Sequence, residues 1–236
     1  MTSERQCAVA RTGSASSQPG HILWLWLEFA LLFTGLPLFL FYLQQGWILP
    51  FLWIAALGCL LCLWRDPVFD RSCLWRHGAL RQAGLAFYGR ILAANLALAT
   101  LLYLLAPHLL FSLPQQRPGL WLMVMLFYPI LSVYPQELIY RAFFFYRYAP
   151  LFPGVHCRIA VSALSFGFMH IIFHNWIAVI LTTIGGILFA RSYVRSRSIA
   201  LSSWEHTLYG CLLFTLGLGP FFYSGGLAEI PGLLRF

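Results

Sequence analysis

The class of this protein is decided by residues 22–43, ILWLWLEFALLFTGLPLFLFYL, which contain a single charge, Glu28. A helix of about 20 apolar residues is long enough to cross a hydrocarbon core about 30 Å thick. Residues 47–64 form a second long run of this kind and carry no charge. The two runs predict a protein that crosses a membrane more than once.

The overall composition supports this class. The chain of 236 residues is 60% hydrophobic and only 9% charged, whereas a soluble domain is about 25% charged. The net charge of +8 comes from 15 basic residues, all of them arginine. No soluble domain presents a basic face, so nucleic acid is not an expected partner. The absence of lysine is typical of a GC-rich coding sequence, and we expect a bacterial inner (plasma) membrane.

Hydropathy predicts an all-α, polytopic transmembrane helical bundle of about seven or eight helices. The tail that follows the last clear span could add a short membrane segment. Pro129 and Pro135 lie within the fourth span, where we expect a kink or a break. The predicted spans are about 22–43, 47–64, 88–111, 119–149, 157–174, 176–194 and 198–216.

The arginines lie in alternate loops between the predicted spans. Loops on the opposite side contain only Arg117. Because arginine and lysine concentrate in cytoplasmic loops, this asymmetry predicts a cytoplasmic N-terminus. The arginine-bearing loops follow the second, fourth and sixth spans and contain Arg65, Arg71, Arg76, Arg81, Arg147, Arg158, Arg191, Arg195 and Arg197.

Three ionisable residues fall at similar predicted depths on three different spans. Glu137 precedes the loop at Pro150 by a length of about 20 Å, and His170 lies about 20 Å beyond that loop. His206 lies about 14 Å into the last span. Its neighbour Glu205 projects about 100° away and need not act with it. Since such groups are costly in lipid, we expect the three to face one another or a watery cavity.

Two simpler interpretations of these residues stay open. Glu137 and Arg141 are four residues apart, so they can form an ion pair with no further role. His170 and His174 have the same spacing, which can place two imidazoles on one metal ion. Together with Glu137 and His206, they would provide enough ligands for zinc.

The patterns QELIYR (136–141), FGFMH (166–170) and EHTLYG (205–210) resemble the motifs of the CPBP family of intramembrane proteases. This family is also called the Abi or CAAX prenyl protease 2-like family, and its motifs are E-E-x-x-x-R, F-x-x-x-H and H-x-x-x-N. The resemblance covers about residues 120–215. It implies a helical membrane bundle that acts as an endopeptidase on a membrane-associated protein or peptide.

The sequence departs from these motifs at two positions. Gln136 stands where the family has the first glutamate, the residue to which the catalytic base is usually assigned. Gly210 stands where the family often has asparagine. We expect the chain to remain active, with Glu137 serving as the base.

The resemblance implies a catalytic set of Glu137, His170, His206, Arg141 and Gln136. Glu137 and His170 would polarise the attacking water, which is general acid–base chemistry. Arg141 would tune Glu137, and His206 would donate to the developing oxyanion. Gln136 would be a second donor, since an amide cannot act as a base. A glutamic mechanism without a cofactor is favoured, and zinc is the minority alternative because no H-E-x-x-H motif is present.

Alternatives from other classes are a pseudoprotease that binds membrane partners, a transporter and a haem-binding protein. Gln136 favours the first, and polar residues such as Glu28 and Arg90 favour the second. The haem alternative would use His170 and His206. The expected partners of the protease are a membrane protein or peptide substrate and the lipid bilayer.

The expected organisation has a protease-like core in the second half of the chain. The Ser-rich N-terminal segment is polar, and the apolar run behind it is too long for a signal peptide. The expected parts are a disordered cytoplasmic tail (1–21), N-terminal transmembrane helices (22–118), a CPBP-like catalytic core (119–216) and a C-terminal tail or short membrane segment (217–236).

Overall fold

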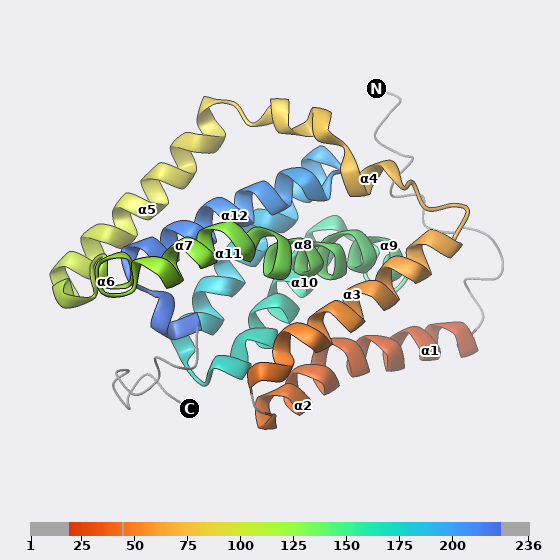
Figure 1. Ribbon diagram of the computed structural model, residues 1–236. Helices are drawn as coiled ribbons and strands as arrows, with labels where there is room; N and C mark the ends of the chain where they lie inside the picture. Colours follow the sequence, from red (N-terminus) through yellow and green to blue (C-terminus); the bar gives the residue numbers. More distant parts are fainter. Residues whose placement is uncertain (1–18, 44, 223–236) are drawn as a thin grey trace.

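The computed structural model describes residues 19–43 and 45–222, which form a bundle of helices (Figure 1). Within these ranges the chain contains no β-strand, so the predicted all-α polytopic bundle is confirmed. The expected disordered tail falls largely outside the described residues, as does most of the expected C-terminal segment.

The first half of the chain forms an outer group of helices. The first apolar run is helical throughout, with a π-helical turn at Leu31–Gly35. The third predicted span ends at Leu105, because Pro107 disfavours helical backbone at the residue before it. The helices of this half are α1 (Pro19–Ala30), α2 (Leu36–Tyr42), α3 (Ile48–Arg65), α4 (Ser72–Trp75), α5 (Leu85–Leu105) and α6 (Ser112–Gln116).

The second half forms the centre of the bundle. In Figure 1, α7 to α9 run as one long green helix across the middle, in front of α12. Its helices are α7 (Pro118–Tyr128), α8 (Tyr134–Glu137), α9 (Phe144–Arg147), α10 (Val155–Met169), α11 (Trp176–Ser196) and α12 (Ile199–Leu216).

The long helix is not broken at its two prolines. Instead, π-helical turns at Pro129–Val133 and Leu138–Phe143 join α7, α8 and α9. The Tyr134 N–H bonds to the carbonyl of Pro129, five residues back. Such wide turns change the direction in which the following side chains project, and they are frequent at functional sites.

Six of the described helical segments are long and apolar enough to cross a membrane. Their outer faces expose large apolar side chains, such as Leu31 (70% exposed) and Leu104 (70%). The chain is therefore an integral membrane protein. The predicted span at 198–216, which corresponds to α12, is not among the six, and α12 packs against α5, α7 and α11. The six segments are Pro19–Tyr42, Ile48–Arg65, Leu85–Leu105, Pro118–Arg147, Val155–Phe173 and Trp176–Ser196.

An aromatic cluster fastens α1 to the long central helix. The ring centroid of Phe33 lies 5.3 Å from that of Tyr140 and 5.5 Å from that of Phe144. Phe29 meets the ring of Tyr148 at 5.4 Å. Edge-to-face pairs of this kind add to the free energy gained by burial, so the central helix has a rigid support.

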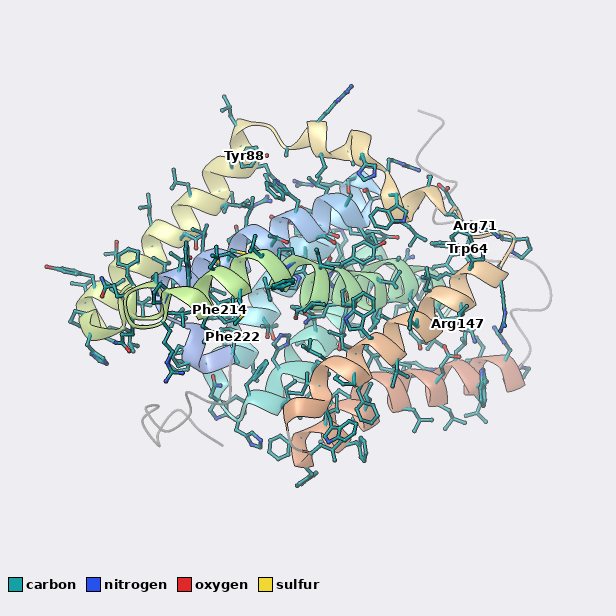
Figure 2. The ribbon with its side chains drawn as sticks, in the orientation of Figure 1. Trp64, Arg71, Tyr88, Arg147, Phe214 and Phe222 are labelled. Carbon is teal, nitrogen blue, oxygen red and sulfur yellow. The ribbon has the colours of Figure 1, made fainter. Side chains whose placement is uncertain are left out.

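A contact between a loop and a helix end organises the arginine-rich segment after α3. The Arg71 guanidinium lies over the Trp64 ring at 4.7 Å, and its Nη2 donates to the Trp64 carbonyl at 2.8 Å (Figure 2). The same guanidinium therefore binds the ring and an otherwise unpaired carbonyl at the end of the helix.

Candidate active site

Glu137 and Arg141 form a fully buried ion pair within the long helix. Both side chains are 0% exposed, and Arg141 Nε donates to Glu137 Oε2 at 3.2 Å. Arg141 Nη1 donates to Ser162 Oγ on α10 at 2.6 Å, and Ser162 donates to the Tyr140 carbonyl at 2.7 Å. These bonds compensate much of the cost of burying the two charges and fix the position of the carboxylate. Arg141 Nη2 is buried without a hydrogen-bond partner in the described part of the chain.

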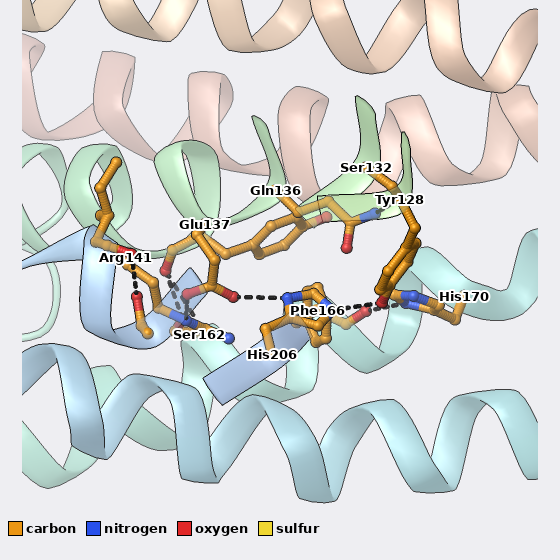
Figure 3. A network of polar contacts seen from close by, with 12 residues as sticks. Tyr128, Ser132, Gln136, Glu137, Arg141, Ser162, Phe166, His170 and His206 are labelled. Carbon is orange, nitrogen blue, oxygen red and sulfur yellow. Dashed lines mark hydrogen bonds and ion pairs between the residues drawn. The ribbon is translucent and has the colours of Figure 1, made fainter. Parts of the chain in front are cut away.

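The other carboxylate oxygen of Glu137 binds His206 on α12. His206 Nδ1 lies 3.0 Å from Glu137 Oε1, and His206 Nε2 lies 3.1 Å from the Tyr128 hydroxyl (Figure 3). Because an ionised carboxylate only accepts hydrogen bonds, Nδ1 carries a proton. Nε2 of the neutral ring then accepts from Tyr128. A continuous chain of hydrogen bonds thus links α8, α12 and α7.

The His206 ring is held between two aromatic side chains. It stacks on Phe189 with a centroid distance of 4.5 Å and an interplanar angle of 15°. It also meets Phe166 at 5.4 Å and 90°. These contacts fix the ring plane, while Glu137 fixes its rotation.

His170 lies where α10 ends and a turn of 3₁₀-helix begins. Its Nδ1 lies 2.7 Å from the Phe166 carbonyl oxygen, which can only accept, so Nδ1 carries the proton of the neutral ring. Nε2 is then the basic nitrogen. The His170 ring lies 4.8 Å from the Phe166 ring, so His170 and His206 contact the same phenyl group.

Both histidines line a large cavity. Its volume is about 1420 Å³, larger than the usual pocket for a small molecule. Most of the lining is apolar and comes from several helices, including α3, α5, α7 and α11. Near the two histidines, the polar side chains of Tyr128 and Gln136 also line the cavity. Glu137 and Arg141 do not reach it.

Gln136 is the member of the Gln136–Glu137 pair that faces the cavity. Its Nε2 donates to Ser132 Oγ at 2.8 Å. Its Oε1 is buried and has no hydrogen-bond partner in the described part of the chain. A buried oxygen of this kind needs a donor from a water molecule or a bound ligand.

The five residues expected to be catalytic therefore gather in one region, as two groups. Gln136, His170 and His206 line the cavity, and Glu137 and Arg141 lie behind His206. Glu137 pairs with His206, not with His170 as expected. Adjacent helical residues project about 100° apart, and of this pair only Gln136 lines the cavity.

The residues considered for zinc do not form a ligand set. Over the described ranges, no three His, Cys, Asp or Glu side chains are grouped so that they could hold a metal ion. His174 has a left-handed backbone (φ 54°), and its ring packs on Phe41 at 4.2 Å. Both carboxylate oxygens of Glu137 already have protein partners.

The sequence did not indicate two members of this site. Tyr128 carries no motif and precedes a proline in an apolar run, and Ser162 is one of several small residues on α10. Both take part only through contacts with residues distant in the sequence. Tyr128 and His206 are 78 positions apart, and Ser162 and Arg141 are 21 positions apart.

Other charged residues within the bundle have partners of their own. Glu205, which is 0% exposed, pairs with Arg90 of α5 at 2.5 Å. It therefore points away from the Glu137 side of α12, as the 100° offset predicts. Glu28 accepts from Arg147 Nε at 3.0 Å and Nη2 at 2.7 Å. Glu28 and Arg90, the residues that favoured a transporter, thus each have an ion-pair partner on another helix.

Comparison with known proteins agrees with the motifs. Residues 117–212 match the family model described as type II CAAX prenyl endopeptidase Rce1-like. No curated protein and no solved structure matches the chain. The matched segment contains all three motifs and the five residues expected to be catalytic.

Proposed function

We propose, from the premise that residues 117–212 form a CAAX-protease-type segment, that this membrane protein is an endopeptidase. Its substrate is a membrane-associated protein or peptide that enters the cavity. The observation that carries the proposal is the position of the proton on the His170 ring. Its Nδ1 is bonded to the Phe166 carbonyl, so the basic Nε2 is available at a cavity large enough for a peptide.

In the proposed reaction, His170 acts as the base. Its Nε2 accepts a proton from a water molecule as the water oxygen attacks the carbonyl carbon of the peptide bond. The same proton is then passed to the departing nitrogen as the C–N bond breaks. The products are a carboxylic acid and an amine, and His170 returns to its neutral form.

Glu137 acts through His206 in this proposal. The carbonyl oxygen of the substrate becomes negatively charged when water attacks, and the His206 side of the cavity stabilises that charge. Glu137 keeps the imidazole oriented and compensates its charge when it is protonated. Arg141 holds Glu137, and the Gln136 amide helps to position the water or the substrate.

A second candidate is a binding protein without catalytic activity. It is favoured by Gln136, which places an amide in the cavity where the related motif has a glutamate. Such a protein would retain a membrane peptide without cleaving it. The two candidates differ in whether any product depends on His170.

The test compares the membrane peptidomes of cells that contain equal amounts of the wild-type protein or His170→Gln. His156→Gln is the matched control, because His156 is an exposed residue of α10 outside the site. We expect products with the wild type and with His156→Gln that are absent with His170→Gln. Identical peptidomes from all three would contradict the endopeptidase and favour the binding protein.

A further inference from the structure

Gly210 lies one turn after His206 on α12, so a side chain at position 210 would project from the same face of the helix. Gly210 itself lines the cavity. A Cβ atom at this position would collide with the Tyr128 ring and with its hydroxyl oxygen. The space that a residue at position 210 would occupy is therefore filled by Tyr128.

Tyr128 is fixed in this space from two sides. Its ring meets His206 edge-on, with a centroid distance of 6.0 Å and an angle of 81°. It meets Phe214 at 5.6 Å and 65°. Tyr128 is the last residue of α7, directly before the π-helical turn that starts at Pro129. The hydroxyl group is thus placed at the cavity by three elements of the bundle.

When His206 is protonated, the hydrogen bonds that link Glu137, His206 and Tyr128 leave the hydroxyl hydrogen of Tyr128 free. In that state Nδ1–H donates to Glu137 and Nε2–H donates to the Tyr128 oxygen, 3.1 Å away. The hydroxyl hydrogen of Tyr128 then no longer points at His206. Because Tyr128 lines the cavity, this hydrogen can bind an acceptor on a bound molecule. Hydrogen bonds in such a chain strengthen one another.

We propose that Tyr128 is a catalytic residue whose hydroxyl donates to the carbonyl oxygen of the peptide bond while negative charge develops on it. This proposal rests on the proposed endopeptidase function. His206 carries its second proton before water attacks and keeps it, and Tyr128 gives a hydrogen bond and keeps its own proton, so neither residue gains or loses a proton in the reaction. Glu137 and His206 polarise the hydroxyl, and Gly210 is required because any larger residue would displace it.

The experiment uses the full-length protein, purified in detergent and added to membranes from cells that lack it. Mass spectrometry follows the rate at which cleavage products appear. Tyr128→Phe removes only the hydroxyl, and we expect the rate to fall about 100-fold, as when one oxyanion donor is lost. Tyr103→Phe is the matched control, since Tyr103 is 65% exposed on α5. Tyr103→Phe should keep the wild-type melting temperature, and Tyr128→Phe should lower it only slightly, because one hydrogen bond to His206 is lost.

A second pair of variants separates the chemical role from packing. Tyr128→Ala should lose activity and leave space beside Gly210. Adding Gly210→Asn to Tyr128→Ala places an amide donor in that space, and we expect it to restore the rate about tenfold. Gly210→Asn in the presence of Tyr128 should lower the melting temperature, because the two side chains collide.

A Tyr128→Phe rate within about threefold of the wild type would overturn the proposal. So would a loss of activity that is matched by a lower melting temperature and is not restored by the double variant. His170→Gln is measured in parallel. If no product depends on His170, the endopeptidase function itself fails, and the role of Tyr128 falls with it.

Discussion

Glu137 and His206 are hydrogen-bonded at 3.0 Å although 69 positions separate them in the sequence. The bond fixes α8 against α12 and sets the orientation of an imidazole that lines the cavity. Arg141 holds the other carboxylate oxygen. Ionisable residues are costly in a membrane, and here Glu137 is bonded to both Arg141 and His206 behind the cavity wall.

The buried pair of Glu137 and Arg141 gives a prediction about stability. Arg141→Gln should lower the free energy of unfolding in detergent by about 3–5 kcal/mol, because it leaves a buried carboxylate without its strongest partner. The double variant Glu137→Gln/Arg141→Gln should lose less than the sum of the two single losses. Arg76→Gln is the control, since its ion pair with Asp70 is exposed (40% and 41%). Strictly additive losses would contradict this coupling.

The ion pair of Glu28 with Arg147 should have a structural role only. Its side chains are 23% and 31% exposed, and it fastens α1 to the central helix. Glu28→Gln should lower the melting temperature, with a loss of about 1–3 kcal/mol in stability. The cleavage rate per folded molecule should not change. A folded Glu28→Gln protein without activity would show that Glu28 takes part in function.

A substitution at Gln136 distinguishes an active peptidase from a binding protein without catalytic activity. The amide cannot take up a proton, and in our account His170 does so. Gln136→Glu should therefore change the wild-type cleavage rate by no more than about tenfold. If the wild type cleaves nothing and Gln136→Glu creates activity, the natural protein is a binding protein. The same membranes and the same mass-spectrometric rate measurement serve for both proteins.

Membrane orientation is a further prediction. The arginine-rich loop between α3 and α5 should face the cytoplasm, because arginine concentrates on that side. Reporter domains fused to the N-terminus and inserted near Arg81 should both be active as cytoplasmic reporters, and one inserted near Gln116 should not. The opposite pattern would reverse the assignment.

The sequence was sufficient to predict an all-α membrane bundle. Long apolar runs have few alternatives in a membrane, since backbone groups there must be bonded within helices. The arginine positions predicted similar depths for Glu137, His170 and His206, and this depth stays a prediction. The expectation that these residues lie in one region follows from the cost of exposing them to lipid.

The sequence was not sufficient for the contacts within the site. Which of Gln136 and Glu137 faces the cavity depends on the rotation of the central helix, and the π-helical turns at Pro129–Val133 and Leu138–Phe143 alter that rotation. Tyr128 enters the site only because Gly210 leaves space for it on another helix. Such contacts arise from packing between helices and leave no local pattern.

In our proposal, this protein activates water for peptide hydrolysis with His170 as the base. The most direct measurement incubates the purified protein with membranes in ¹⁸O-labelled water and analyses the products by mass spectrometry. We predict one ¹⁸O atom in each new C-terminal carboxylate with the wild type and with His156→Gln, and no such products with His170→Gln. Labelled products that appear equally with His170→Gln would contradict the account.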